Sequence, residues 1–140
     1  MGWIPDGLRE CEGVSFLPEV YGYEAYVAKV LSRGWAMAIA PLMDSPFENC
    51  KTNLKFREYG AFGVPGVYSA VPLYSTCVES GHTGLLTENS DSSWAQAIEW
   101  LVADPQLRTT IARNARAYVE SHHAQPLAAE QLRAHLTVKG

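Results

Sequence analysis

Along the chain, short apolar runs alternate with longer stretches in which apolar residues recur at helical spacing. Short runs rich in β-branched or apolar residues predict strands over 14–17, 35–40, 65–69 and 85–87. Apolar residues at helical spacing predict helices over 23–32, 91–102, 105–120 and 126–136, with one more between a polar opening at 51–53 and Gly63. The alternation of strands and helices predicts an α/β fold with a parallel sheet and a helical C-terminus.

Several boundaries of these elements follow from local signals. The continuous apolar run 35–40 stands between a helix and a loop, which is typical of a buried parallel strand. Residues 42–50 are rich in turn formers and predict a loop, and residues 71–78 predict a short helix followed by a turn of strand. Asp91 or Ser92 is the expected N-cap of the helix over 91–102, and Asp104 before Pro105 that of the next helix.

The stretch 51–65 carries the clearest candidate chemistry. Its polar opening, residues 51–53, stands where a helix exposes backbone N–H groups without partners, and such a helix start attracts anions, phosphate above all. Gly63 ends the helix at a position that favours a left-handed residue, and Pro65 prevents its continuation. Gly66, inside the next predicted strand, indicates a close approach of another group to the backbone.

Charged residues form a stripe on this helix. At about 100° per residue, Lys51, Lys55 and Glu58 fall within an arc of about 60°, whereas most of the remaining surface is apolar. We therefore expect a largely buried helix whose charges are either paired or face a cleft. An i,i+3 ion pair between Lys55 and Glu58 is the plainer of these two interpretations.

Composition and charge narrow the class of protein. The chain has 140 residues, 47% hydrophobic and 19% charged, with a net charge of −4, which is typical of a globular domain. The sequence has no basic run of the kind that indicates binding to nucleic acid or to an acidic membrane surface. Cys11, Cys50 and Cys77 show no C-x-x-C spacing, so we expect no disulfide framework, no metal site and a reducing, cytoplasmic setting. No apolar run reaches the roughly 18 residues of a membrane span, and no signal-peptide pattern is visible.

The order of the short motifs is more specific than any one of them. Ala40-Pro41-Leu42 is followed by Ser45-Pro46-Phe47, the 51–65 stretch, Gly81-His82-Thr83-Gly84-Leu85-Leu86, a helix at Trp94 and Ala103-Asp104-Pro105-Gln106-Leu107-Arg108. Over nearly its whole length the chain resembles the C-terminal half of retaining glycosyltransferases of the GT-B fold, of the large glycosyltransferase 4 (group 1) type. The resemblance implies a Rossmann-like, three-layer domain over 1–140 that binds a nucleotide diphosphate sugar. It also implies that the first βα units and the N-terminal acceptor domain are missing, so that the isolated chain is inactive.

The resemblance assigns roles to residues of the central stretch. Glu58 matches the second of two glutamates in the family motif, which binds the ribose hydroxyls. The first glutamate of the motif would fall on Cys50, so this chain departs from the family there. The departure leaves open the contacts to the transferred sugar and whether the reaction retains or inverts its configuration. The backbone amides of Thr52, Asn53 and Leu54 match the helix start that holds the diphosphate. Lys51 and Lys55 would add positive charge there.

A second segment completes the implied site. Leu17, Pro18 and Glu19 match a loop that contacts the nucleobase. The donor would be of UDP, GDP or dTDP type, carrying a hexose or deoxyhexose, and the acceptor a saccharide or lipid. No cofactor or metal is expected, because helix amides and lysines can stabilise the leaving diphosphate.

Further expectations and rival interpretations stay open. The missing units would expose a sheet edge, which predicts self-association, and the full-length protein would be cytoplasmic or peripheral to a membrane. A non-catalytic flavodoxin-like nucleotide-binding or interaction domain is the main rival, although the sequence lacks the acidic cluster of receiver-type domains. A sugar-nucleotide epimerase of similar shape would need acidic and histidine residues that the chain does not supply.

The remaining histidine, cysteine and tryptophan residues are expected to have structural roles. His82 is expected in a turn rather than in catalysis, and the pair at 122–123 at a helix end rather than on a metal. Cys50 is expected to be a small filler rather than a reactive thiol. The tryptophans at 35, 94 and 100 are expected in the core rather than in a base-stacking platform.

Overall fold

The computed structural model describes residues 6–123, which form two compact units divided between Gly34 and Trp35. The first unit contains α1 (Asp6–Arg9) and α2 (Tyr23–Leu31), so the helix predicted over 23–32 is confirmed. The strand predicted over 14–17 is wrong, because these residues form no strand and Val14 and Phe16 stay close to half exposed. Alternating β-rich residues make a strand only where a neighbouring strand pairs with them.

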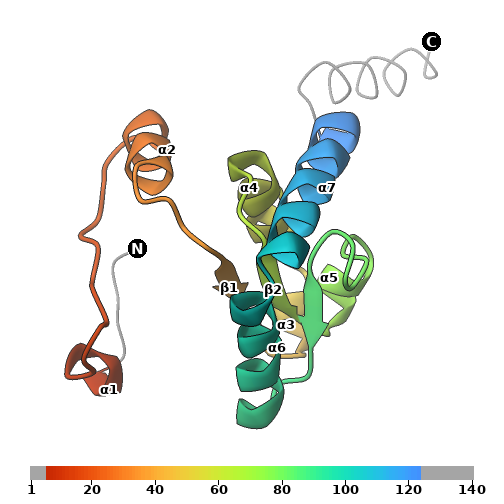
Figure 1. Ribbon diagram of the computed structural model, residues 1–140, viewed down its shortest axis with the longest axis horizontal. Coiled ribbons are helices and arrows are strands. Elements are labelled where there is room, and N and C mark those ends of the chain that lie inside the picture. The colour runs from red at the N-terminus through yellow and green to blue at the C-terminus, as the bar shows by residue number, and fades with distance from the viewer. Residues whose placement is uncertain (1–5, 124–140) are drawn as a thin grey trace. The chain divides into compact units, whose positions relative to one another are not determined.

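The second unit is built on a parallel sheet (Figure 1). Its strands are β1 (Ala38–Ala40), β2 (Gly66–Ser69) and β3 (Leu85–Thr87), in the spatial order β1-β2-β3. Both pairs are parallel, which confirms the predicted sheet. The predicted strand 35–40 is shorter than expected and is not buried throughout, since Ile39 is 47% exposed. Among residues 6–123, β1 pairs with β2 alone, so one edge of this strand remains uncovered.

The helices of the second unit include one that was not expected. They are α3 (Pro46–Asn49), α4 (Leu54–Phe62), α5 (Pro72–Ser75), α6 (Asp91–Ala103) and α7 (Pro105–His123). The predictions of α6, α7 and the short helix α5 are confirmed, whereas the turn of strand after α5 is absent and the predicted loop 42–50 contains α3. The helix predicted over 126–136 lies outside the described residues. Within residues 6–123 no helix is both long and apolar enough to cross a membrane.

The core lies on both faces of the sheet. Successive side chains of a strand point to opposite faces, and on β2 the buried Val67 and Tyr68 belong to different apolar clusters. Val67 packs with residues of β3, α6 and α7, including Leu101 and Ile111. Tyr68 packs with Phe56 of α4 and with residues of α5 and its following turn. Helices α4 and α7 also run side by side (Figure 1). Helix layers on each side of a parallel sheet make the expected three-layer arrangement.

The glycine in β2 is explained by Tyr68. A Cβ atom at Gly66 would collide with the phenol of Tyr68, and one at Gly84 would lie 2.8 Å from Cε2 of the same ring. The tyrosine ring therefore packs directly on backbone at two positions where only glycine fits. This confirms that Gly66 marks a close approach to the backbone.

Candidate functional site

The carboxyl ends of the three parallel strands lie at one edge of the sheet, where open α/β sheets bind their ligands. A hydrogen-bonded network joins the loops that follow them. The Leu42 N–H donates to Ser69 Oγ at 2.8 Å, Ser69 Oγ donates to Asn89 Oδ1 at 2.7 Å, and Asn89 Nδ2 donates to the Leu42 carbonyl at 2.7 Å. Ser69 is fully buried. Because each of the three residues bonds to both others, the network fixes the loop after β1 against those after β2 and β3.

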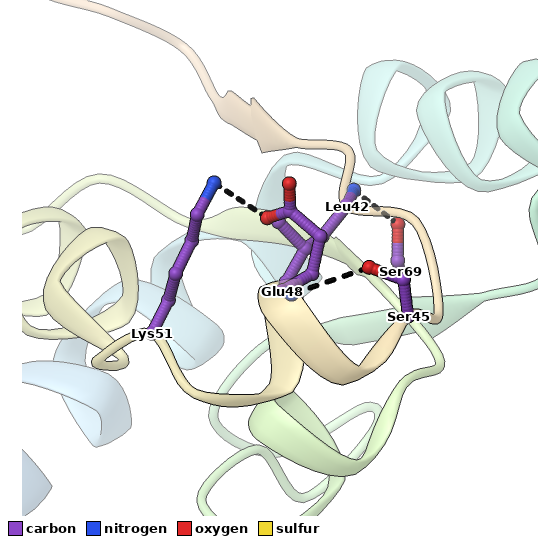
Figure 2. A network of polar contacts seen from close by, with 5 residues as sticks. All are labelled: Leu42, Ser45, Glu48, Lys51 and Ser69. Atoms are coloured by element: carbon purple, nitrogen blue, oxygen red, sulfur yellow. Dashed lines mark hydrogen bonds and ion pairs between the residues drawn. The ribbon is translucent and has the colours of Figure 1, made fainter.

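Helix α3 follows the loop after β1 and begins with a capping interaction (Figure 2). Ser45 is its N-cap, and its Oγ accepts from the Glu48 N–H at 3.2 Å, while Pro46 occupies the first turn. The sequence contains the signal for this helix, since Ser45 and Glu48 have the S-x-x-E spacing of a capping box and proline favours the first helical position. A loop was predicted here instead, because residues 42–50 are rich in turn-forming residues.

Glu48 and Lys51 form an ion pair that sequence reasoning missed. Lys51 Nζ lies 2.5 Å from Glu48 Oε2, and the Glu48 side chain is only 21% exposed (Figure 2). Lys51 lies before α4 and is not part of it, because α4 starts at Leu54 with Asn53 as N-cap. The expected stripe of three charges on one helix is wrong for Lys51, because α3 ends at Asn49 and the chain bends before the next helix begins.

Helix α4 carries a buried carboxylate. Glu58 is 7% exposed, and its Oε2 lies 3.2 Å from Nζ of Lys55, whose side chain is half exposed. The plainer interpretation, an i,i+3 ion pair, is thus present in the structure. A charged group so close to the core needs such a partner, because burial of an isolated carboxylate is strongly unfavourable.

The two ends of α4 match the sequence signals. The Arg57 N–H donates to the Asn53 carbonyl at 3.2 Å, so the amides of Thr52, Asn53 and Leu54 precede the first intrahelical hydrogen bond. At the other end Gly63 has φ 67° and the left-handed conformation that the sequence predicts. The helix start therefore offers donors beside Lys55.

A known protein family matches the segment that contains α4. Residues 54–118 match the family of glycosyl transferases group 1. No curated protein sequence matches the chain at a significant level.

Solved structures agree with this family match. Sucrose-phosphate synthase from Thermosynechococcus elongatus is similar over 83% of this chain, with 28% identity and a TM-score of 0.65. HepE from Anabaena, solved with UDP and glucose and with UDP-glucose, is similar over 80% of this chain, with 20% identity and a TM-score of 0.69. These matches confirm the expected resemblance to GT-B glycosyltransferases and the fold. The chain spans 29% of the synthase chain and 29 to 30% of the HepE chains.

The other residues that the resemblance assigned lie as follows. Leu17, Pro18 and Glu19 belong to the first unit and to no strand, and their role at a nucleobase stays a prediction. Cys50 is the exposed C-cap residue of α3, and its N–H donates to the Phe47 carbonyl at 3.3 Å. The position that the resemblance assigns to the first glutamate thus lies at the end of a helix that has its own acidic residue, Glu48.

A buried thiol lies next to the start of α4. Burial raises the pKa of Cys77, while a hydrogen bond to the Asn53 side chain and the charge of Arg57 act in the opposite direction. Burial also raises the pKa of Tyr74, with smaller contributions from Cys77 and Glu48. These groups are therefore neutral at pH 7 and pack as core residues.

The histidines have structural partners. Asn114 Nδ2 lies 3.1 Å from Nδ1 of His82 and donates to the His82 carbonyl at 3.2 Å, so His82 fastens its loop to α7. His122 stacks on Tyr118 with the ring centroids 4.1 Å apart. Burial lowers the pKa of His123, with contributions from Arg57 and His122. Within residues 6–123 no group of three or more His, Cys, Asp or Glu residues is placed to hold a metal ion.

The tryptophans divide between core and surface. Trp94 packs against the Val67 cluster, as expected. Trp35 and Trp100 are 43% and 54% exposed, so their assignment to the core is wrong. Trp100 lies on α6 next to the inward-facing Leu101, and one step along a helix turns the side chain by about 100°, away from the core.

Proposed function

We propose that this chain is the donor-binding part of a glycosyltransferase that takes a sugar from a nucleotide diphosphate sugar. The observation that carries the proposal is the buried carboxylate of Glu58, held on α4 three residues after its half-exposed partner Lys55. Even a paired buried charge adds little to the stability of a fold, so a buried ion pair close to a helix start is better explained by a ligand than by stability. The match of residues 54–118 to a glycosyltransferase family supports the same role.

The proposed binding mode uses the start of α4 and both lysines. The amides of Thr52, Asn53 and Leu54 would donate to the diphosphate, whose negative charge the helix dipole favours. Lys51 and Lys55 are more than 40% exposed at their side chains, so each can turn from its glutamate toward a phosphate oxygen. Stabilising the leaving nucleotide diphosphate is the catalytic contribution that such a site makes.

Glu58 has a separate task in this proposal. When Lys55 turns toward the diphosphate, Glu58 would accept hydrogen bonds from the two ribose hydroxyls. A carboxylate offers about four lone-pair positions and makes strong, charge-assisted contacts of this kind. Binding would therefore exchange an ion pair inside the protein for contacts with the nucleotide.

We choose UDP as the first nucleotide to test, because HepE was solved with UDP and with UDP-glucose. GDP and dTDP are the alternatives. The transferred hexose or deoxyhexose, the saccharide or lipid acceptor, and independence of metal ions belong to the proposal as well. The proposal also includes a single donor-binding domain, a cytoplasmic or membrane-peripheral location, self-association through the open sheet edge, and the inability of this chain to transfer sugar alone.

Isothermal titration of UDP into the full chain tests the proposal. We expect Glu58→Gln to weaken binding by about tenfold, since it removes a charge-assisted contact. Glu120→Gln is a matched control, because Glu120 also pairs with a basic residue of its own helix, Arg116, but is 64% exposed and lies on α7. The proposal fails if the wild-type chain binds none of UDP, GDP and dTDP, or if the two variants bind equally. The flavodoxin-like alternative predicts no dependence on Glu58.

A further inference from the structure

A cavity of about 420 Å³ lies beside β3 and α6, with no contribution from α3 or α4. This volume falls within the range of about 300–1,000 Å³ that is usual for small-molecule sites. Its polar and aromatic lining comes from the loop before β3, from β3 itself and from one side of α6. The principal lining residues are Ser80, Leu86, Thr87, Ser93, Gln96 and Trp100.

The lining of this cavity combines three kinds of group. Trp100 presents an indole that is 54% exposed, Gln96 an exposed amide, and Ser80 and Ser93 hydroxyls. None of the described residues that line the cavity has a charged side chain. A pyranose ring needs this set, because its C–H face packs on an aromatic surface while its hydroxyls exchange hydrogen bonds with amides and hydroxyls. We propose that this cavity, the Trp100 pocket, binds a neutral saccharide.

The hydrogen bonds already made around the pocket leave room for such a ligand. Ser93 Oγ accepts from Ser90 Oγ at 2.8 Å, and Ser80 Oγ accepts from the Leu86 N–H at 3.0 Å. Each of these two hydroxyls can still donate its own proton. The Gln96 amide adds two donors and an acceptor to the same rim.

Two other ligand classes fit the Trp100 pocket less well. A nucleotide or another anion would find no lysine or arginine among the lining residues that the structure describes, whereas Lys51 and Lys55 lie at the start of α4. A peptide strand added to β3 would need the backbone donor on the free edge of that strand. The Leu86 N–H already donates to Ser80 Oγ, so that edge is capped by a side chain.

NMR titration of the ¹⁵N-labelled full chain with maltotriose and with cellotriose tests this proposal. We expect at least one of these neutral trisaccharides to shift the indole N–H signal of Trp100 and the side-chain amide signals of Gln96. The indole signal of Trp35, which is 43% exposed but lies outside the pocket, should stay in place. The proposal is overturned if neither trisaccharide moves the Trp100 signal at millimolar concentration, or if UDP moves it and the trisaccharides do not.

Variants then localise the binding. Trp100→Ala should weaken trisaccharide binding by about tenfold or more, and Trp35→Ala should leave it unchanged. Gln96→Ala provides a second variant that keeps the fold, because Gln96 is exposed and alanine is the best helix former. We expect a loss of about threefold for this variant, from one removed hydrogen-bonding group. Equal affinity of wild type and both pocket variants would refute the site.

Discussion

The second unit contains two helix pairs of different construction. Helices α3 and α4, of four and nine residues, carry two paired glutamates. The loop that leads to them is held in place by Asn89 and by the buried Ser69. Helices α6 and α7, of 13 and 19 residues, have capped starts and an apolar stripe toward the sheet. The first pair keeps charge near the core at a cost in stability, whereas the second supplies apolar burial. We infer that nucleotide binding resides in the first pair and support for it in the second.

The largest expected effect is at the contact between α4 and α7. A Cβ atom added at Gly60 would lie 2.7 Å from Cγ2 of Val119 and 3.0 Å from the Ala115 carbonyl oxygen. Gly60→Ala therefore forces the backbone of α7 away from α4. We expect the free energy of unfolding to fall by about 2–3 kcal/mol, as measured by urea denaturation.

Two controls sharpen the Gly60 prediction. Gly7→Ala places a Cβ where no atom lies within 4 Å, so it should not destabilise the chain. Val119→Ala combined with Gly60→Ala should recover part of the lost stability, because it removes the nearest atom. If Gly60→Ala is as stable as wild type, α4 and α7 do not support each other as closely as the structure indicates.

The second largest effect is expected where polar contacts hold the loop before α3. Ser69→Ala removes an acceptor from the Leu42 N–H and a donor to Asn89 in a fully buried position. We expect a loss of about 2 kcal/mol in the free energy of unfolding, together with weaker UDP binding. Ser92→Ala, at an exposed position of α6, should change neither quantity. UDP affinity unchanged by Ser69→Ala would mean that this network does not position the site.

The same contrast explains how much of the fold was predictable from sequence. Helices α6 and α7 were predicted closely because their signals are local: an apolar stripe at helical spacing, and Asp104 with Pro105 at the start of α7. Even here the N-cap of α6 is Ser90 rather than Asp91 or Ser92, a displacement of one or two residues. Strands β2 and β3 were also found, since each is a short apolar run between turns.

The candidate site was less predictable because its contacts are not local. Ser69, Asn89 and Leu42 are 20 to 47 residues apart in sequence, and no spacing rule brings them together. Lys51 was wrongly placed on α4 because a helical wheel assumes one continuous helix. In the structure it lies between α3, which ends at Asn49, and α4, which begins at Leu54. Glu58 and Lys55, three residues apart on α4, were found because their contact is local.

The two apolar clusters, one at α4 and α5 and the other at α6 and α7, also differ in chemistry. We expect alkaline pH to lower the stability that the first cluster supplies and not that of the second. The cluster at α4 and α5 contains the ionisable Tyr68, Tyr74 and Cys77, and burial raises the pKa of each. The buried residues of the cluster at α6 and α7 are all aliphatic. In the unfolded chain these three groups ionise near 9.0 for cysteine and 10.0 for tyrosine.

The sign of the pH effect follows from these raised values. Above about pH 9 the unfolded chain binds fewer protons than the folded chain, so stability that is complete below this pH is lost as the pH rises. The loss approaches about 1.4 kcal/mol per pH unit for each such group. Tyr68→Phe should flatten the dependence above pH 10, and Tyr23→Phe, at an exposed position, should not. Denaturation at stepped pH measures this, and an equal slope for the two variants would contradict it.

The smallest predicted effect isolates the supporting pair. Asp104 Oδ1 accepts from the Leu107 N–H at 2.9 Å and so caps α7. Asp104→Ala should lower the free energy of unfolding by about 1 kcal/mol and shift Tm by about 3 °C, with faster hydrogen exchange in the first turn of α7. UDP affinity should stay unchanged under conditions where the chain is folded, because the hydrogen bonds of Asp104 join it to residues of α6 and α7. If this variant weakened UDP binding without lowering stability, the division between a nucleotide-binding pair and a supporting pair would be wrong.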